Sequence, residues 1–154
     1  MATEIGKYLK KLKANKAQIS RQTGISTSRI NAIVNSENAK PYADELYKIV
    51  YYAQKNAGLT EEYFNKAIRE IYSGLKTIDL LEEFQDLSPE ARFFKKFTLQ
   101  QKDIEAKLNI APGKIRKYFN DKTKRALASD IIAFAEGMKL DILEAFKELF
   151  GELE

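Results

Sequence analysis

Residues 16–35 read KAQISRQTGISTSRINAIVN, and this segment indicates two short helices joined by a turn. Gly24 suits the left-handed conformation that often ends a helix, and Ser26 is a good N-cap for the helix that follows. Ile30 and Ile33 are spaced so that they share one face of this second helix, which we expect to be buried. A helix, a turn with glycine and a second helix three residues later are typical of the helix-turn-helix.

The opposite face of the second helix carries side chains that suit DNA base edges. Asn31 offers a donor and an acceptor, Thr27 and Ser28 offer hydroxyls, and the methyl groups of Thr27 and Ala32 can meet a thymine methyl. Arg29, at the margin of this face, can bind a phosphate or a guanine. We therefore predict these five residues as base-reading. The alternative is that small polar residues are present because they start helices well.

Charge alternates in blocks along the 154 residues, although the net charge is only +4. Residues 1–56 carry a net charge of +6 and residues 57–92 a net charge of −4. Residues 93–128 then carry +7 and residues 129–154 carry −5. Two basic blocks, each followed by an acidic one, indicate two copies of a module with one face directed at a polyanion.

An internal repeat supports this interpretation. A shift of 85 positions aligns residues 16–53 with residues 101–138 without a gap. Apolar positions coincide, so that Ile19 falls on Ile104. Identities are few, and the signal lies in the register of the predicted core. The alternative is two unrelated helical stretches that share a 3.6-residue pattern.

The composition predicts an all-α fold, because the chain has only seven glycines and three prolines and shows no sustained strand alternation. We predict two tandem five-helix domains, at residues 1–75 and 88–154, joined by an acidic helical connector at 76–87. Ser88 is expected to cap the first helix of the second domain. The expected helices of that domain lie near 89–98, 101–108, 112–119, 127–137 and 141–150.

Several classes of function are excluded by what the chain lacks. It contains no histidine, cysteine or tryptophan, which removes Cys/His zinc sites, cysteine nucleophiles and histidine-dependent triads. We expect no enzymatic activity, no metal and no cofactor. No apolar run approaches the roughly 20 residues of a membrane helix, so we expect no membrane partner and a cytoplasmic protein.

The segment 16–35 is followed by the polar loop SENAKP (36–41) and the apolar segment ADELYKIVYYA (43–53). Together these residues resemble the lambda repressor and Cro type of helix-turn-helix domain, over residues 5–72. The resemblance implies a five-helix DNA-binding fold with base-facing residues at Thr27, Ser28 and Ala32. It also implies backbone or phosphate contacts at Lys16 and Asn35. To these we add two residues of the polar loop, Asn38 and Lys40. Ser36 stands where family members often have glycine, and Val34 where they often have an acidic residue.

The second module is similar to the same family, with departures. Its loop NDKTKRA (120–126) resembles the phosphate-clamping loop of the family, and we predict phosphate contacts from it at Asn120, Lys122, Thr123, Lys124 and Arg125. Its recognition helix lies in APGKIRKYFN, where Gly113 replaces Ser28 and removes a base-reading side chain. Lys114, Arg116 and Lys117 remain, so this helix is expected to act more electrostatically. The alternative is a degenerate copy used for packing or dimerisation.

These observations predict a sequence-specific DNA-binding transcriptional regulator, a repressor of bacterial or phage type, whose partner is double-stranded DNA. Lysine and arginine supply most of the affinity, and the helix near 27–34 selects the sequence. One chain is expected to cover an asymmetric site, with a homodimer on a longer palindrome as the alternative. A protein-interaction module, such as an antitoxin or an adaptor, is the alternative function.

Overall fold

Residues 2–154 are described by a computed structural model, in which they form ten α-helices and no β-strand. This confirms the all-α prediction. The N-terminal half contains α1 (Glu4–Lys11), α2 (Lys16–Thr23), α3 (Thr27–Asn35), α4 (Ala43–Asn56), a 3₁₀ turn η1 (Glu61–Tyr63) and α5 (Phe64–Ile71). The C-terminal half contains a 3₁₀ turn η2 (Glu82–Phe84), α6 (Pro89–Lys95), α7 (Gln101–Leu108), α8 (Lys114–Asn120), α9 (Ala128–Gly137) and α10 (Ile142–Phe150).

Local sequence signals explain most helix ends. The Ser26 hydroxyl accepts a hydrogen bond from Arg29 N at 3.1 Å and starts α3, and the Ser88 hydroxyl caps α6 in the same way. Gly24 ends α2 with a φ of 78°. The start of α8 differs from the expected one by two residues, because the φ of 82° at Gly113 is incompatible with a helix.

The acidic connector contains less helix than predicted, only the three residues of η2. Its path is fixed by other bonds. The Asp79 carboxylate accepts from Leu81 N at 2.9 Å, and Leu80 N donates to the carbonyl of Gly137 on α9, also at 2.9 Å. The Leu80 side chain is buried against Ile104 and Met138. Tertiary contacts with α7 and α9 therefore replace the expected local helix.

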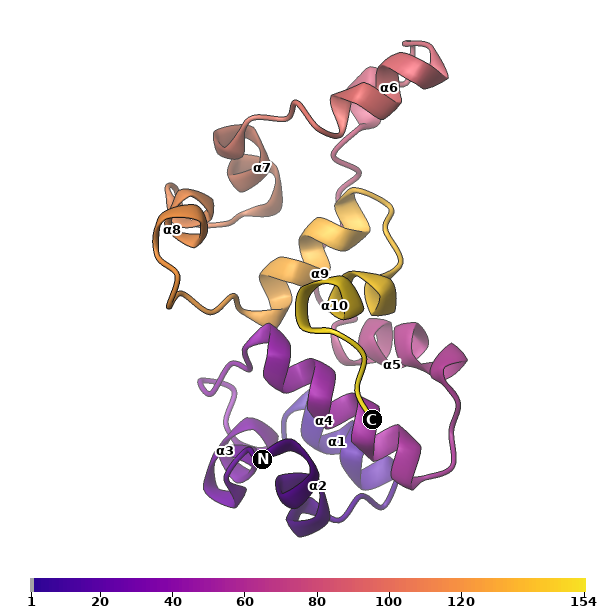
Figure 1. The fold of residues 1–154 in the computed structure, drawn as a ribbon, viewed down its shortest axis with the longest axis vertical. Helices are drawn as coiled ribbons and strands as arrows, with labels where there is room; N and C mark the ends of the chain where they lie inside the picture. The colour runs from indigo at the N-terminus through magenta and orange to yellow at the C-terminus, as the bar shows by residue number, and fades with distance from the viewer. Residues whose placement is uncertain (1) are drawn as a thin grey trace.

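One main core joins the two halves of the chain. Buried residues of α1 to α5 share it with residues of α9 and α10, and Figure 1 shows these two helices lying against α4 and α5. Phe146 of α10 is fully buried and stacks on Tyr47 of α4, with ring centroids 5.5 Å apart. The shared core shows that residues 1–75 and 88–154 pack on one another. Their division into two domains stays a prediction.

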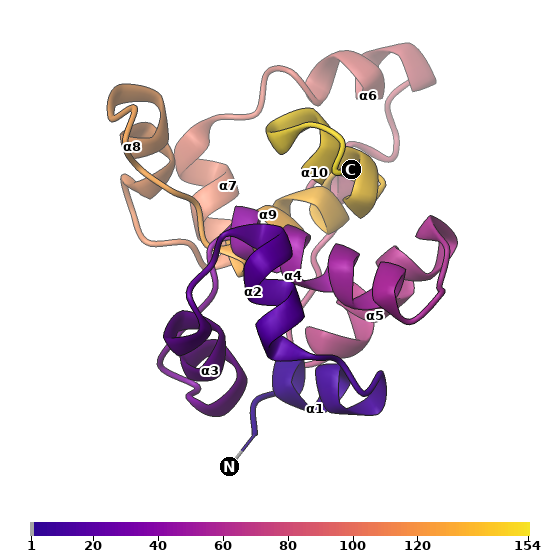
Figure 2. The same ribbon diagram turned by 60° about the horizontal axis from the view of Figure 1, so that its bottom comes forward.

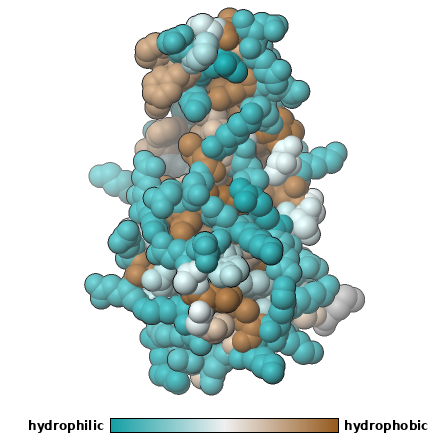
Figure 3. Space-filling model, turned by 90° about the vertical axis from the view of Figure 1, so that its right-hand side faces the viewer, coloured by the Kyte–Doolittle hydropathy of each residue, from teal (hydrophilic) through white to brown (hydrophobic). Residues whose placement is uncertain are grey.

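Helix α6 differs from α1, its counterpart in the repeat. Helix α1 packs against α3 and α5, and its Gly6 lies so close to Val34 that a Cβ there would clash with the Val34 carbonyl. Ala91 occupies the corresponding place in α6, which makes no packing of this kind with α8 or α10. Its aromatic side chains, Phe93 and Phe94, are exposed instead, as is Phe97 just beyond its end. Figure 1 shows α6 at the top of the molecule, where Figure 3 shows hydrophobic atoms at the surface.

Candidate nucleic-acid interface

Helices α2 and α3 form a rigid pair. The Asn15 side chain caps α2 by accepting from Gln18 N at 3.1 Å, and the turn at Gly24 leads directly into α3. The Ser20 hydroxyl donates to the carbonyl of Ile25 at 2.6 Å and ties the turn to α2. Ile19 of α2 and Ile30 of α3 are fully buried, so the first helix supports the second from behind.

The outer face of α3 is free of tertiary packing. Thr27, Ser28 and Asn31 are exposed, whereas Ala32 is half-buried. Lys16, at the start of α2, donates from Nζ to Oδ1 of Asn31 at 3.3 Å, which places a cation beside this face. The exposed face of α3 thus carries the hydroxyls of Thr27 and Ser28 and the amide of Asn31. These are donor and acceptor types that recognise base edges.

Arg29 lies apart from this face. Its Nε and Nη2 donate to the two carboxylate oxygens of Glu45 at 2.9 and 2.8 Å, and Nη2 also donates to the carbonyl of Lys40. These hydrogen bonds raise the pKa of Arg29. Burial opposes ionisation of Glu45, but Arg29 and the Tyr42 N–H together lower the Glu45 pKa. Arg29 therefore holds α3 on α4 through Glu45. The contact of Arg29 with DNA stays a prediction.

The predicted phosphate contacts of the first half border α3. Asn35, at the end of α3, and Asn38 and Lys40, in the loop that follows, are exposed, and Lys16 is half-buried. Asn35, Asn38 and Lys40 lie at or after the C-terminal end of α3, and Lys16 lies beside Asn31. A duplex backbone passes beside such a face when a helix lies in the major groove.

The α7–α8 pair repeats the α2–α3 pair with a different turn. Asn109 takes the left-handed conformation that Gly24 takes in the first half, with a φ of 58°. The buried carboxylate of Glu105 accepts from Gly113 N at 3.0 Å and from Ile115 N at 2.9 Å, and so caps the start of α8. The sequence reasoning missed this role of Glu105, because its capping bonds come from another helix.

The basic residues of the second half fall into two groups. Lys114 is half-buried and forms an ion pair with Asp130 at 2.6 Å. Burial alone lowers the pKa of Lys114, but the hydrogen bond and the charge of Asp130 outweigh it, so the pKa is raised. Arg125 donates to both carboxylate oxygens of Asp44, at 2.8 and 2.9 Å, with its guanidinium 4.2 Å from the centre of the Tyr42 ring. The other candidates are exposed: Arg116, Lys117, Asn120, Lys122, Thr123 and Lys124. These six residues, with Arg125, whose side chain is 49% exposed, form the accessible part of the predicted second surface.

The loops that follow α3 and α8 meet. Tyr42 and Leu127 form an isolated antiparallel bridge, with hydrogen bonds from Ala43 N to the carbonyl of Ala126 at 2.8 Å and from Ala128 N to the carbonyl of Pro41 at 3.0 Å. Helices α3 and α8 lie on the left-hand side of the molecule in both Figure 1 and Figure 2. The contact therefore brings two of the loops predicted to bind phosphate together between two exposed helices.

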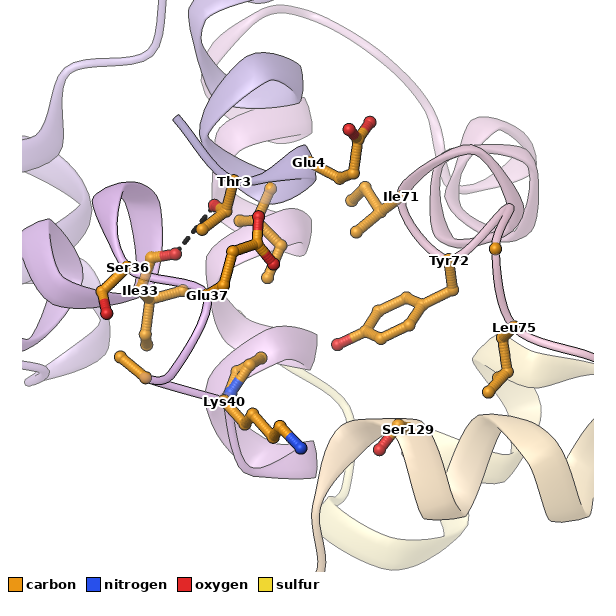
Figure 4. A pocket seen from close by; sticks show the side chains of 14 residues that line it. Thr3, Glu4, Ile33, Ser36, Glu37, Lys40, Ile71, Tyr72, Leu75 and Ser129 are labelled. Carbon is orange, nitrogen blue, oxygen red and sulfur yellow. Dashed lines mark hydrogen bonds between the residues drawn. The ribbon is translucent and has the colours of Figure 1, made fainter. Parts of the chain in front are cut away.

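A cavity of about 550 Å³ lies behind this surface. Figure 4 shows Tyr72 pointing into it from the end of α5, opposite Ile33 and Lys40, while Thr3 donates to the α3 backbone. Burial strongly raises the pKa of Tyr72, so its phenol stays protonated at physiological pH. Within the described residues no group of three or more acidic side chains could hold a metal ion.

Compared with known protein families, with characterised proteins and with solved structures, the chain shows no match. The resemblance to the lambda repressor and Cro family therefore stays an expectation that depends on the residues quoted above. Within residues 2–154, every helix is too short or too polar to span a lipid bilayer.

Proposed function

We propose that this protein is a sequence-specific DNA-binding regulator, in which α2 and α3 form a helix-turn-helix and α3 enters the major groove. The observation that carries the proposal is the outer face of α3, where Thr27, Ser28 and Asn31 are exposed beside Lys16 while the opposite face is packed on the core. A helix in this position supplies base-edge contacts, and flanking basic side chains supply the salt-dependent affinity.

The second half supports the same function through charge. Arg116 and Lys117 on α8, with Lys122 and Lys124 in the next loop, are exposed. Helix α8 itself lies on the same side of the molecule as α3 (Figure 1). Pro112 and Gly113, which directly precede α8, carry no polar side chain at the positions of Thr27 and Ser28. Helix α8 therefore contributes mainly phosphate contacts, with Arg116 as its candidate for a base contact.

Selection of duplexes from a random library, with the full chain as bait, tests this function. The proposal requires an enriched sequence, and Ser28→Ala and Asn31→Ala should each reduce discrimination at one base position by about 1–3 kcal/mol. Ser73→Ala is the matched control, because Ser73 is exposed beyond the end of α5. Failure to enrich any sequence, with salt-insensitive or absent binding, would contradict the proposal.

The exposed phenylalanines of α6 favour a second function, that of a protein-interaction module such as an antitoxin or an adaptor. Phe93 lies in edge-to-face contact with Phe94, its neighbour on α6, and with Phe97 just beyond the helix, and the three residues are 53, 65 and 74% exposed. Exposed apolar clusters of this kind mark interaction sites. Co-purification of a stoichiometric partner that is lost on Phe94→Ala, together with no DNA binding, would support this function over the first.

A further inference from the structure

The two halves of the chain meet about a local two-fold axis. Tyr42 and Leu127 occupy the same position in the 85-residue repeat, and they are the two residues paired in the antiparallel bridge. The two hydrogen bonds of the bridge also join equivalent atoms, from Ala43 to Ala126 in one direction and from Ala128 to Pro41 in the other. An antiparallel pair has a two-fold axis through its centre, so here the axis exchanges equivalent positions of the two halves.

The same relation extends outward from the bridge. Helices α4 and α9 begin at Ala43 and Ala128, directly after it, and pack against each other. Helix α2 packs on α3 and α4, and α7 packs on α8 and α9. The rotation that places α4 on α9 therefore also carries α3 onto α8.

An equivalent ion pair fixes each exposed helix to the helix that follows it. In the first half Arg29 of α3 binds Glu45 of α4, and 85 residues later Lys114 of α8 binds Asp130 of α9. Because both pairs join equivalent positions of the 85-residue repeat, α3 and α8 are presented in corresponding orientations about the axis. Both helices lie on the same side of the molecule.

We propose that a single chain reads an imperfect inverted repeat, with α3 on one half-site and α8 on the other. This inference rests on the proposed DNA-binding function. Half-sites mirror the symmetry of the protein that reads them, so two helices related by a two-fold axis require half-sites that point in opposite directions. Modules related by translation would require a direct repeat. Successive major grooves on one side of a duplex place the half-sites about 10 bp apart.

The two half-sites differ in sequence because the two helices differ. Asn31 and Arg116 occupy equivalent positions, and both are exposed. Asparagine pairs best with adenine in the major groove and arginine with guanine. The half-site under α3 therefore carries adenine at the position where the half-site under α8 carries guanine. Fewer other positions are specified under α8, since Pro112 and Gly113 replace Thr27 and Ser28.

Selection from a random library with the full chain, followed by sedimentation of the complex, tests the inference. We expect two inverted half-sites and one chain per duplex. Asn31→Ala should relax one half-site only, and Arg116→Ala the symmetry-related position of the other. Arg116→Asn should convert the preference there from guanine to adenine. Lys139→Ala, at an exposed lysine beyond α9, is the control that leaves both half-sites unchanged.

Three results would overturn the inference while the proposed function stands. These are half-sites in direct repeat, no change in either half-site on Arg116→Ala, and two chains per duplex with Asn31→Ala relaxing both halves. If no sequence is enriched, the proposed function itself fails. Circular dichroism of each variant should match that of the wild type, because the substituted side chains are exposed.

Discussion

Arg29 and Glu45 form a two-pronged ion pair that holds α3 against α4, with donor–acceptor distances of 2.9 and 2.8 Å. The Glu45 side chain is 7% exposed and the Arg29 side chain 30% exposed. The same carboxylate accepts from Tyr42 N at the start of α4. One residue thus fixes both the beginning of α4 and the position of the exposed helix, which gives the pair a role in stability and in presentation of α3.

Replacement of Glu45 by glutamine should lower the free energy of unfolding at pH 7 by about 1–3 kcal/mol, because a partly buried guanidinium loses its charged partner. The folded state lowers the pKa of Glu45 from its ordinary 4.5, so the carboxylate stabilises the fold above that pH and this contribution is lost as the pH falls below it. Urea titrations at pH 7 and about pH 3 should therefore show a smaller difference between variant and wild type at the acidic pH. Glu148→Gln, at an exposed carboxylate on α10, is the control. An equal difference at both pH values would contradict the assigned role.

Equivalent residues of α1 and α6 should respond differently to truncation. Leu9 is 3% exposed and Phe94, at the same repeat position, is 65% exposed. Leu9→Ala should cost about 2–5 kcal/mol of stability, whereas Phe94→Ala should stay within about 0.5 kcal/mol. Chemical denaturation of the two variants and the wild type measures both changes in the free energy of unfolding. A large loss for Phe94→Ala would mean that α6 is packed in solution.

Truncation of Phe146 should weaken both halves of the chain together. The ring is fully buried and stacks on Tyr47, so Phe146→Ala should lower stability by about 3–5 kcal/mol. Hydrogen exchange should then quicken in α4 as well as in α10. Phe150→Ala, at a side chain 39% exposed, is the control with a smaller loss. Faster exchange confined to α9 and α10 would show that the two halves are energetically separate.

Loss of one exposed lysine should alter the salt dependence of DNA binding. Lys124 lies in the loop after α8, and Lys124→Ala should weaken binding to all sequences alike and reduce the slope of log K against log salt by about 1. Fluorescence anisotropy with a selected duplex and an unrelated one, over a series of salt concentrations, measures both effects. Lys66→Ala, at an exposed lysine on α5, should leave the slope unchanged. A change of affinity for only one of the duplexes would assign Lys124 to base recognition instead.

Local signals predicted most of the helices and several of their ends. Ser26, Ser88 and Gly24 act where the sequence indicated, because caps depend on a few neighbouring residues. The connector was less predictable. An acidic amphipathic stretch indicated helix. The Asp79 carboxylate, which accepts from Leu81 N, and the bond from Leu80 N to the Gly137 carbonyl hold it as a turn instead. The bond between Leu80 and Gly137 joins residues far apart in the chain, and no short pattern reports it.

The candidate site divides in the same way. Exposure of Thr27, Ser28 and Asn31 follows from the spacing of Ile30 and Ile33, which sets the buried face of the helix. The partners of Arg29 and Arg125 do not follow from spacing. A charged side chain beside a polar face looks free until the fold brings a carboxylate to it, as Glu45 and Asp44 are brought here.

The order of residues alone determined that this chain is helical and which faces of the short helices are apolar, because both depend on neighbours within a few turns. It also contains the recurrence after 85 positions, which appears when the sequence is compared with itself. Only the tertiary structure decided how the two halves face each other, that α9 and α10 complete the core of the first half, and that α6 remains uncovered. The reason is physical: a buried face specifies that it must be covered, and it leaves open which distant segment covers it.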